Sequence, residues 1–257
     1  NSLIDRLFDE KSQIEVTHQE REKYGLLAVG KFIEVNVEVV ESARESLTPK
    51  EEKARLFVEK YVKDFVAAKN KILAEQGKRL IGDWPKLHVS GIQEVDNKFE
   101  IEIQHGVASY GQLIALGFED DGLNQAYKAY MKTSLEDQID FDRFKELFLP
   151  KSFTVSGLIF TSDNHILVAK RHPDKVGTHG EAWHVPAGYI DDADRNDAGR
   201  IDPFKAMRRE AYEEVGISMD QISDLICVGA AKIPSGSNVE ILFIGRTSLK
   251  STDIVDR

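Results

Sequence analysis

The stretch Arg209-Glu210-Ala211-Tyr212-Glu213-Glu214-Val215-Gly216-Ile217 brings three carboxylates and an arginine into one short run that ends at a glycine. At about 100° per residue, Glu210, Glu213 and Glu214 fall on one face of a helix. A separate apolar stripe consists of Phe204, Met207, Ala211 and Val215. The run therefore predicts a helix with one buried face and one acidic face.

The acidic face of this helix is a candidate metal site. Like charges spaced at i,i+4 disfavour a bare helix by about 0.2–0.5 kcal/mol per pair. Three carboxylates that converge beside a buried stripe favour a counter-cation. A hard divalent ion with oxygen ligands, Mg²⁺ or Mn²⁺, meets that requirement.

Length, charge and cysteine content narrow the class of protein. The 257 residues allow one large domain or two small ones, and the net charge of −10 argues against a general binder of nucleic acids or anionic membranes. Cys227 is the only cysteine, which excludes an intrachain disulfide and a thiolate zinc cluster. No apolar run approaches the ~18 residues of a membrane span, and the first ten residues lack the plan of a signal peptide. We expect a cytoplasmic protein that acts on a small molecule.

The N-terminal part predicts strands and one long helix. Residues 1–30 show too little periodicity for an assignment. Apolar residues alternate over 33–39, which predicts a half-exposed strand, with a helix as the alternative. Thr48, Pro49 and Glu51 form a strong helix start, with a capping box and a proline at the first helical position, and that helix should run to about Gln76.

The middle of the chain predicts a hairpin and short helices. Two runs, 86–92 and 98–105, read as strands joined by a turn at 96–97. Short helices are expected at 110–116 and 123–131, followed by an acidic linker at 136–142. His88 and His105 are interpreted as structural or surface residues.

After Pro150 the pattern changes to strands and turns, which suggests a boundary between an N-terminal region, 1–149, and a second domain, 150–257. Strands are expected at 153–160, 166–170, 225–230 and 239–246, with a short strand that ends in a tight turn at 183–188. The acidic helix should begin at Asp202 as N-cap and Pro203 as first helical residue. Trp183 is expected to pack in the core, with stacking on a base as the alternative.

Gly188 together with the run from Arg209 to Ile217 resembles the Nudix box. That pattern is a glycine, five residues, a glutamate, seven residues, and then Arg-Glu-apolar-x-Glu-Glu-x-Gly-apolar. The second half matches at every specified position. Counting eight residues back from Arg209 reaches Ile201 where the first glutamate should stand, so residues 191–200 resemble an insertion. Asp191 or Asp202 could replace that glutamate, and a solvated loop without a role is the other reading.

The resemblance implies an α+β fold of the α/β/α sandwich type, with a Nudix-like mixed sheet, preceded here by a mostly helical region with a β-hairpin. It also implies metal-dependent hydrolysis of a nucleoside diphosphate linked to another moiety. By their match to the motif, the candidate catalytic residues are Arg209, Glu210, Glu213 and Glu214, and the three glutamates are the candidate ligands for Mg²⁺ or Mn²⁺.

Other site residues are less specific. Gly188 would allow close approach of the backbone at the turn. Lys170 and Arg171 could contact substrate phosphates, with solvated surface charges as the alternative. Glu240 is a candidate general base, although a solvated glutamate at a strand end is the simpler interpretation.

A second resemblance lies in the N-terminal part. Trp84-Pro85-Lys86-Leu87, the following hairpin and Gly106-Val107-Ala108-Ser109-Tyr110 are similar to the region that precedes the Nudix domain in members like UDP-glucose pyrophosphatase. This resemblance implies cleavage of a UDP-sugar to UMP and sugar 1-phosphate. The alternatives are hydrolysis of ADP-ribose, NADH or a dinucleotide, and a Nudix-like regulatory module that binds nucleotides without turnover.

Overall fold

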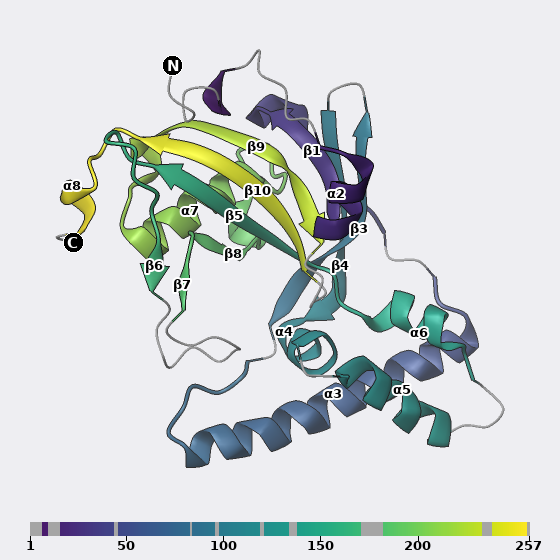
Figure 1. The fold of residues 1–257 in the computed structure, drawn as a ribbon. Coiled ribbons are helices and arrows are strands. Elements are labelled where there is room, and N and C mark those ends of the chain that lie inside the picture. Colours follow the sequence, from purple (N-terminus) through teal and green to yellow (C-terminus); the bar gives the residue numbers. More distant parts are fainter. Residues whose placement is uncertain are drawn as a thin grey trace.

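The computed structural model of the protein describes residues 7–9, 16–43, 46–82, 84–95, 98–118, 121–133, 138–170, 182–232 and 238–255. One curved mixed sheet organises the chain (Figure 1). Its strands run in the spatial order β1 (Leu26–Phe32), β9 (Ile222–Lys232), β10 (Asn238–Thr247), β5 (Ser152–Phe160), β3 (Pro85–Val95), β4 (Lys98–Ser109) and β2 (Val37–Glu41), while β8 (Ala187–Tyr189) pairs with β5. Strands β6 (Ala169–Lys170) and β7 (Trp183–His184) form a separate small ribbon.

The first 30 residues, which the sequence left unassigned, contain helix α2 (His18–Tyr24) and the edge strand β1. Strand β1 pairs antiparallel with β9, almost two hundred residues away. The pairing is close at Gly229, where an added Cβ would lie 2.1 Å from the carbonyl oxygen of Ala28. Gly229 also has φ +139°. A glycine is therefore required here both by the backbone conformation and by the lack of room for a Cβ.

The strand predicted over 33–39 is only partly present. Residues Glu34–Asn36 form a 3₁₀ turn, and strand β2 begins at Val37. The turn is needed because β1 and β2 stand at opposite ends of the strand order. The sheet curls so that β1 comes near β4, where the rings of Phe32 and Phe99 stack with centroids 5.4 Å apart.

The long helix α3 (Pro49–Glu75) has the predicted bounds and capping box, in which the backbone N–H of Thr48 donates to Glu51 at 2.7 Å. Helices α5 (Gly122–Thr133) and α6 (Phe141–Phe148) pack with it at one end of the sheet (Figure 1). The acidic linker expected at 136–142 is wrong from Phe141 onward. Asp140 caps helix α6 there, and this helix buries Phe144. The predicted short helix after the hairpin is present as α4 (Tyr110–Gln112), continued by a π-helix (Leu113–Phe118).

The hairpin of β3 and β4 is confirmed, and its predicted turn at 96–97 lies outside the described residues. Strand β3 also pairs with β5 through His88 and Ser152. His88 is buried and its Nδ1 accepts a hydrogen bond from the backbone N–H of Lys151 at 3.1 Å, as a structural histidine would. The sheet therefore crosses the predicted boundary at 149/150, and the division into two domains stays a prediction.

The C-terminal half of the sheet carries the acidic helix α7 (Pro203–Val215) against one face. Strands β5 and β10 run parallel, β10 and β9 antiparallel. Helix α7 packs closely on strand β5, since a Cβ on Gly157 would lie 2.8 Å from the sulfur of Met207. The strand expected at 166–170 is wrong in length: an isolated bridge joins Ile166 to Phe160, and only Ala169–Lys170 form β6.

The predicted α+β class, with a mixed sheet and a helical N-terminal region that includes a hairpin, is confirmed. Short elements complete the described chain: 3₁₀ turns at Asp192–Asp194 and Met219–Gln221, and helix α8 (Thr252–Val255). None of the described helices is long and apolar enough to cross a membrane.

Candidate functional site

Helix α7 begins and ends where the sequence predicts. The carboxylate of Asp202 accepts from the backbone N–H groups of Phe204 (2.9 Å) and Lys205 (3.2 Å), and Pro203 occupies the first helical position. Gly216 ends the helix in the left-handed conformation at φ +72°. These local signals fix the two ends of α7. Burial of its apolar stripe in the core leaves its carboxylates at the edge of the sheet.

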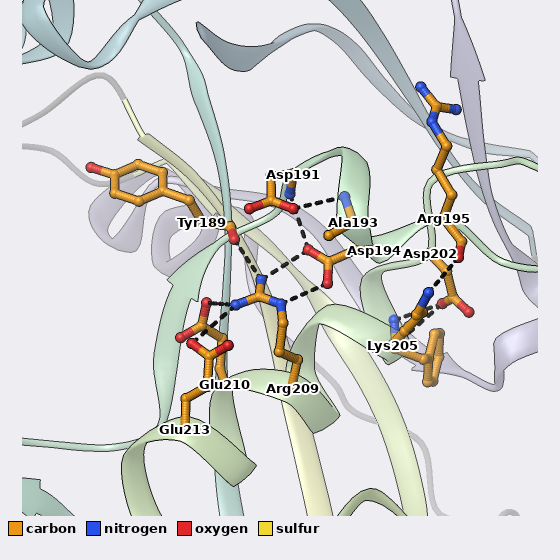
Figure 2. Close-up of polar contacts among 11 residues, drawn as sticks. Tyr189, Asp191, Ala193, Asp194, Arg195, Asp202, Lys205, Arg209, Glu210 and Glu213 are labelled. Carbon is orange, nitrogen blue, oxygen red and sulfur yellow. Dashed lines mark hydrogen bonds and ion pairs between the residues drawn. The ribbon is translucent and has the colours of Figure 1, made fainter. Parts of the chain in front are cut away.

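Arg209 is the centre of the polar network at this edge (Figure 2). Its Nε and Nη2 donate to the two carboxylate oxygens of Asp194 at 2.8 and 2.9 Å, and Nη2 also donates to the carbonyl of Tyr189 at 2.9 Å. Its Nη1 donates to Glu210 at 2.7 Å and to Glu213 at 3.4 Å. The hydrogen bonds with Asp194 are the largest cause of a raised pKa for Arg209, so the guanidinium charge is firmly held.

Asp194 is a candidate site residue that the sequence interpretation missed. It is fully buried, and it faces Arg209 in a bidentate ion pair. Counting forward from Gly188 would have found it, because five residues separate Gly188 from Asp194, as in the box pattern. Fourteen residues, 195–208, then precede Arg209 instead of seven, so the insertion follows this acidic residue and does not precede it.

The two residues proposed as replacements for the glutamate have other partners. The side chain of Asp191 accepts from the backbone N–H of Ala193 at 2.8 Å and caps a 3₁₀ turn, while Asp202 caps α7. Within the described chain, Arg209 bonds to neither of them. The backbone N–H of Asp191 donates to Asp194 at 3.0 Å, so the turn positions the buried carboxylate.

The insertion is a folded loop that packs on the N-terminal region. A bridge between Arg195 and Ile201 closes it, and Ile201 is buried. Arg195 pairs with Glu41 in β2, and its carbonyl accepts from Lys205 at 2.6 Å. The loop therefore returns the chain from Asp194 to the start of α7 without disturbing the ion pair with Arg209.

The three box glutamates have different environments. Glu210 is buried against Gly188, where an added Cβ would lie 2.1 Å from a carboxylate oxygen, and burial raises the pKa of Glu210. Glu213 is 54% exposed. Glu214 accepts from the backbone N–H of Ala187 at 2.9 Å and lies 3.6 Å from Nδ1 of His184. A glycine is thus required at position 188, because the Glu210 carboxylate occupies the space that a Cβ would need.

The donor set fits a hard divalent cation in its chemistry. Glu210 and Glu213 supply carboxylate oxygens that meet at one nitrogen of Arg209, and the buried Glu210 is a carboxylate whose charge lacks hydration. No three His, Cys, Asp or Glu side chains in the described ranges are already gathered as a complete ligand group. Glu214 lies apart from the other two glutamates, because its carboxylate accepts a hydrogen bond from the backbone of Ala187 in β8.

The remaining predicted site residues are more scattered. Lys170 is exposed at the end of β6, and Arg171 lies outside the described residues. Trp183 is 68% exposed, so the expectation of core packing is wrong. It lines a cavity of about 560 Å³ together with Glu214 and Gly216. Glu240 is partly buried in β10, and burial raises its pKa, in contrast to the solvated residue that we expected.

The comparison with protein families concerns the part of the chain that carries this site. Residues 150–250 match the family model of the NUDIX domain. This segment is therefore similar to the NUDIX domain, and the match covers less than half of the chain. Nudix hydrolases generally use divalent metal ions. No curated protein matched the chain.

The solved structures that are similar to this chain have low sequence identity to it. The MutT protein of Methanosarcina mazei Go1 is 20% identical, with a TM-score of 0.28 over 40% of this chain and 68% of that one. A protein of Deinococcus radiodurans is 19% identical (TM-score 0.29, 38% and 57%). A MutT/nudix family protein of Enterococcus faecalis is 18% identical (TM-score 0.29, 51% and 49%). This chain thus spans little more than half of the second protein and about half of the third.

Proposed function

We propose that the protein hydrolyses the pyrophosphate bond of a nucleoside diphosphate linked to another moiety, with Mg²⁺ or Mn²⁺ as cofactor. The observation that supports this most strongly is the ion pair of Arg209 with the buried Asp194. That pair restores the acidic residue missing from the expected position and holds Arg209 against Glu210 and Glu213. In this proposal Asp194 takes the place of the first box glutamate, although the box is interrupted in sequence.

Each box residue has a defined task in this proposal. Glu210, Glu213 and Glu214 would hold the divalent ion, which when bound neutralises phosphate oxygens and lowers the pKa of a coordinated water. Arg209 orients Glu210 and Glu213 through its Nη1. Gly188 leaves the space that the Glu210 carboxylate occupies. Glu240 remains the candidate general base, and it is partly buried in β10, where burial raises its pKa.

A nucleotide sugar such as UDP-glucose, cleaved to UMP and sugar 1-phosphate, is the proposed substrate. The support is the resemblance of the segments around Trp84 and Tyr110 to the region before the Nudix domain in UDP-glucose pyrophosphatases. The hairpin between those segments pairs with β5 of the Nudix strands, so this region belongs to the same sheet. ADP-ribose, NADH and dinucleotides are the competing substrates.

The test is a screen of UDP-glucose, ADP-ribose, NADH and diadenosine polyphosphates with Mg²⁺ and Mn²⁺, followed by identification of the products. We expect metal-dependent release of a nucleoside monophosphate. Glu213→Gln and Glu214→Gln should each lower kcat/KM on the order of 100-fold, whereas Glu75→Gln at the exposed end of α3 should not. Full activity in both site variants would refute the assignment, and nucleotide binding without turnover would indicate a regulatory module instead.

A further inference from the structure

Four side chains from both halves of the chain meet beside the Nudix box, and we call them the lysine–aromatic cluster: Trp84, Lys86, Tyr110 and Tyr189. Lys86, near the start of β3, places Nζ 4.1 Å from the ring centroid of Tyr189 and 5.9 Å from that of Tyr110. Trp84 stacks on Tyr110 at 6.4 Å with the planes 20° apart. Tyr110 meets Tyr189 edge to face at 6.2 Å.

The cluster adjoins the box residues directly. Tyr189 follows Gly188, and its carbonyl accepts from Arg209. Asp191 and Glu210 lie near enough to Lys86 to stabilise its charge, while Arg209 opposes it. The ammonium of Lys86 therefore lies near Glu210, one of the carboxylates that we assign to the metal. Lys86 is in β3, outside the segment 150–250 that matches the NUDIX domain.

Packing alone does not account for this lysine. Lys86 is partly buried, and burial lowers its pKa, so its ammonium has lost much of its hydration. Among the described residues, its Nζ contacts aromatic rings and forms neither a hydrogen bond nor an ion pair. A lysine ammonium has three donors, so an incoming anion would find them available at the edge of the box.

The aromatic members supply a second kind of surface. Trp84 remains 49% exposed although it stacks on Tyr110. A planar ring next to a cation suits a nucleoside phosphate, because every base has a face that can stack on an aromatic side chain. The order along the cluster, from exposed Trp84 to partly buried Lys86 to the box, matches the order from base to phosphate in such a ligand.

We propose that the lysine–aromatic cluster is the nucleotide-binding half of the active site, in which Lys86 binds a phosphate oxygen and Trp84 stacks on the base. This inference rests on the proposed function and adds residues to it. It explains how a chain of net charge −10 holds an anionic substrate, because Lys86 would add its positive charge to that of the metal that the box glutamates would hold. It also gives the N-terminal hairpin a role in substrate binding.

The test is equilibrium binding of UDP, ADP and inorganic pyrophosphate in the presence of Mg²⁺, for the full chain and three variants. Lys86→Met keeps the apolar stem and removes the charge, and we expect about tenfold weaker binding of all three probes. Lys86→Arg should recover part of the loss. Lys98→Met removes an exposed lysine from the other end of the same hairpin and should bind as the wild type does. In hydrolysis, Lys86→Met should raise KM more than it lowers kcat.

Trp84 provides an optical readout that does not depend on turnover. The chain has two tryptophans, so Trp183→Phe leaves Trp84 as the only one. UDP and ADP should quench its emission, whereas pyrophosphate should not. Binding of both nucleotides without a change in emission would overturn the placement of the base.

Failure of this inference is distinguishable from failure of the proposed function. If Lys86→Met is folded and binds the probes as tightly as the wild type while the wild type hydrolyses a substrate, Lys86 is not a phosphate ligand and the function stands. If the wild type neither binds the probes nor hydrolyses any compound in the screen, both are refuted. A melting temperature for each variant establishes that the compared proteins are folded.

Discussion

Asp194 and Arg209 form a bidentate ion pair, with Nε to Oδ1 at 2.8 Å and Nη2 to Oδ2 at 2.9 Å, although fifteen positions separate them in the chain. Asp194 is fully buried and the Arg209 side chain is 19% exposed. Parallel, charge-assisted bonds of this kind fix direction as well as distance. The pair consequently determines where Nη1 of Arg209 meets the glutamates of the box.

Asp194→Asn should impair both stability and activity. The amide would place an N–H group against the guanidinium and remove the compensating charge, at a cost of about 2–4 kcal/mol in the free energy of unfolding. We expect kcat/KM to fall about 10–100-fold because Arg209 loses its orientation. Urea unfolding and steady-state kinetics measure the two effects. Asp192→Asn, at a carboxylate that is 68% exposed, is the control and should change stability by less than about 0.5 kcal/mol. Wild-type behaviour of Asp194→Asn would show that the pair is dispensable.

Gly188→Ala should displace the carboxylate of Glu210. The new Cβ would lie 2.1 Å from its oxygen, which no rotamer of alanine avoids. We expect a cost of about 1–3 kcal/mol from overpacking, together with a loss of hydrolysis that added metal does not restore. Gly199→Asn is the control: nothing lies within 4 Å of a Cβ there, and asparagine tolerates its φ of +77°. Equal losses in both variants would show that a general sensitivity of glycines, and not Glu210, is responsible.

Glu51→Gln should make the helical end less stable in a pH-dependent way. The backbone N–H of Thr48 and then the side chain of Arg143 hold the pKa of Glu51 at about 2, below its ordinary 4.5. The pKa of Glu51 is lower in the folded protein than in the unfolded one. Its contribution to stability is therefore complete above pH 4.5 and is lost as pH falls toward 2. Glu51→Gln should therefore cost about 1–2 kcal/mol at pH 7, and the difference from wild type should shrink below pH 4.5. A constant difference down to pH 3 would contradict this origin.

Cys227 should be unreactive in the native protein. Its thiol is completely buried in β9, where burial raises the pKa to about 12. A thiol-specific reagent at pH 8 requires the thiolate and access to it. We expect labelling only through unfolding, at a rate that rises with urea, and one labelled thiol per chain once the protein is denatured. Rapid labelling without denaturant would mean that β9 opens locally.

The sequence predicted helices better than strands because helix signals are local. Thr48, Glu51 and Pro49 mark the start of α3 within four residues, and Asp202, Pro203 and Gly216 do the same for α7. Strand β1 gave no such signal, since its partner β9 lies near the other end of the chain. The 3₁₀ turn at 34–36 was also hidden, because the alternation of apolar residues does not show that the chain passes there between β1 and β2, at opposite ends of the strand order.

The sequence by itself determined the acidic face of α7, its apolar stripe and its two ends, since these follow from helical periodicity and capping. The spacing from Gly188 distinguishes Asp194 from Asp191 and Asp192 in the sequence, but only the tertiary structure shows that a 3₁₀ turn buries Asp194 against Arg209. The same holds for Lys86, which is one lysine among many until the pairing of β3 with β5 carries it to the box. Burial and long-range pairing assign these roles, because both depend on residues far away in the chain.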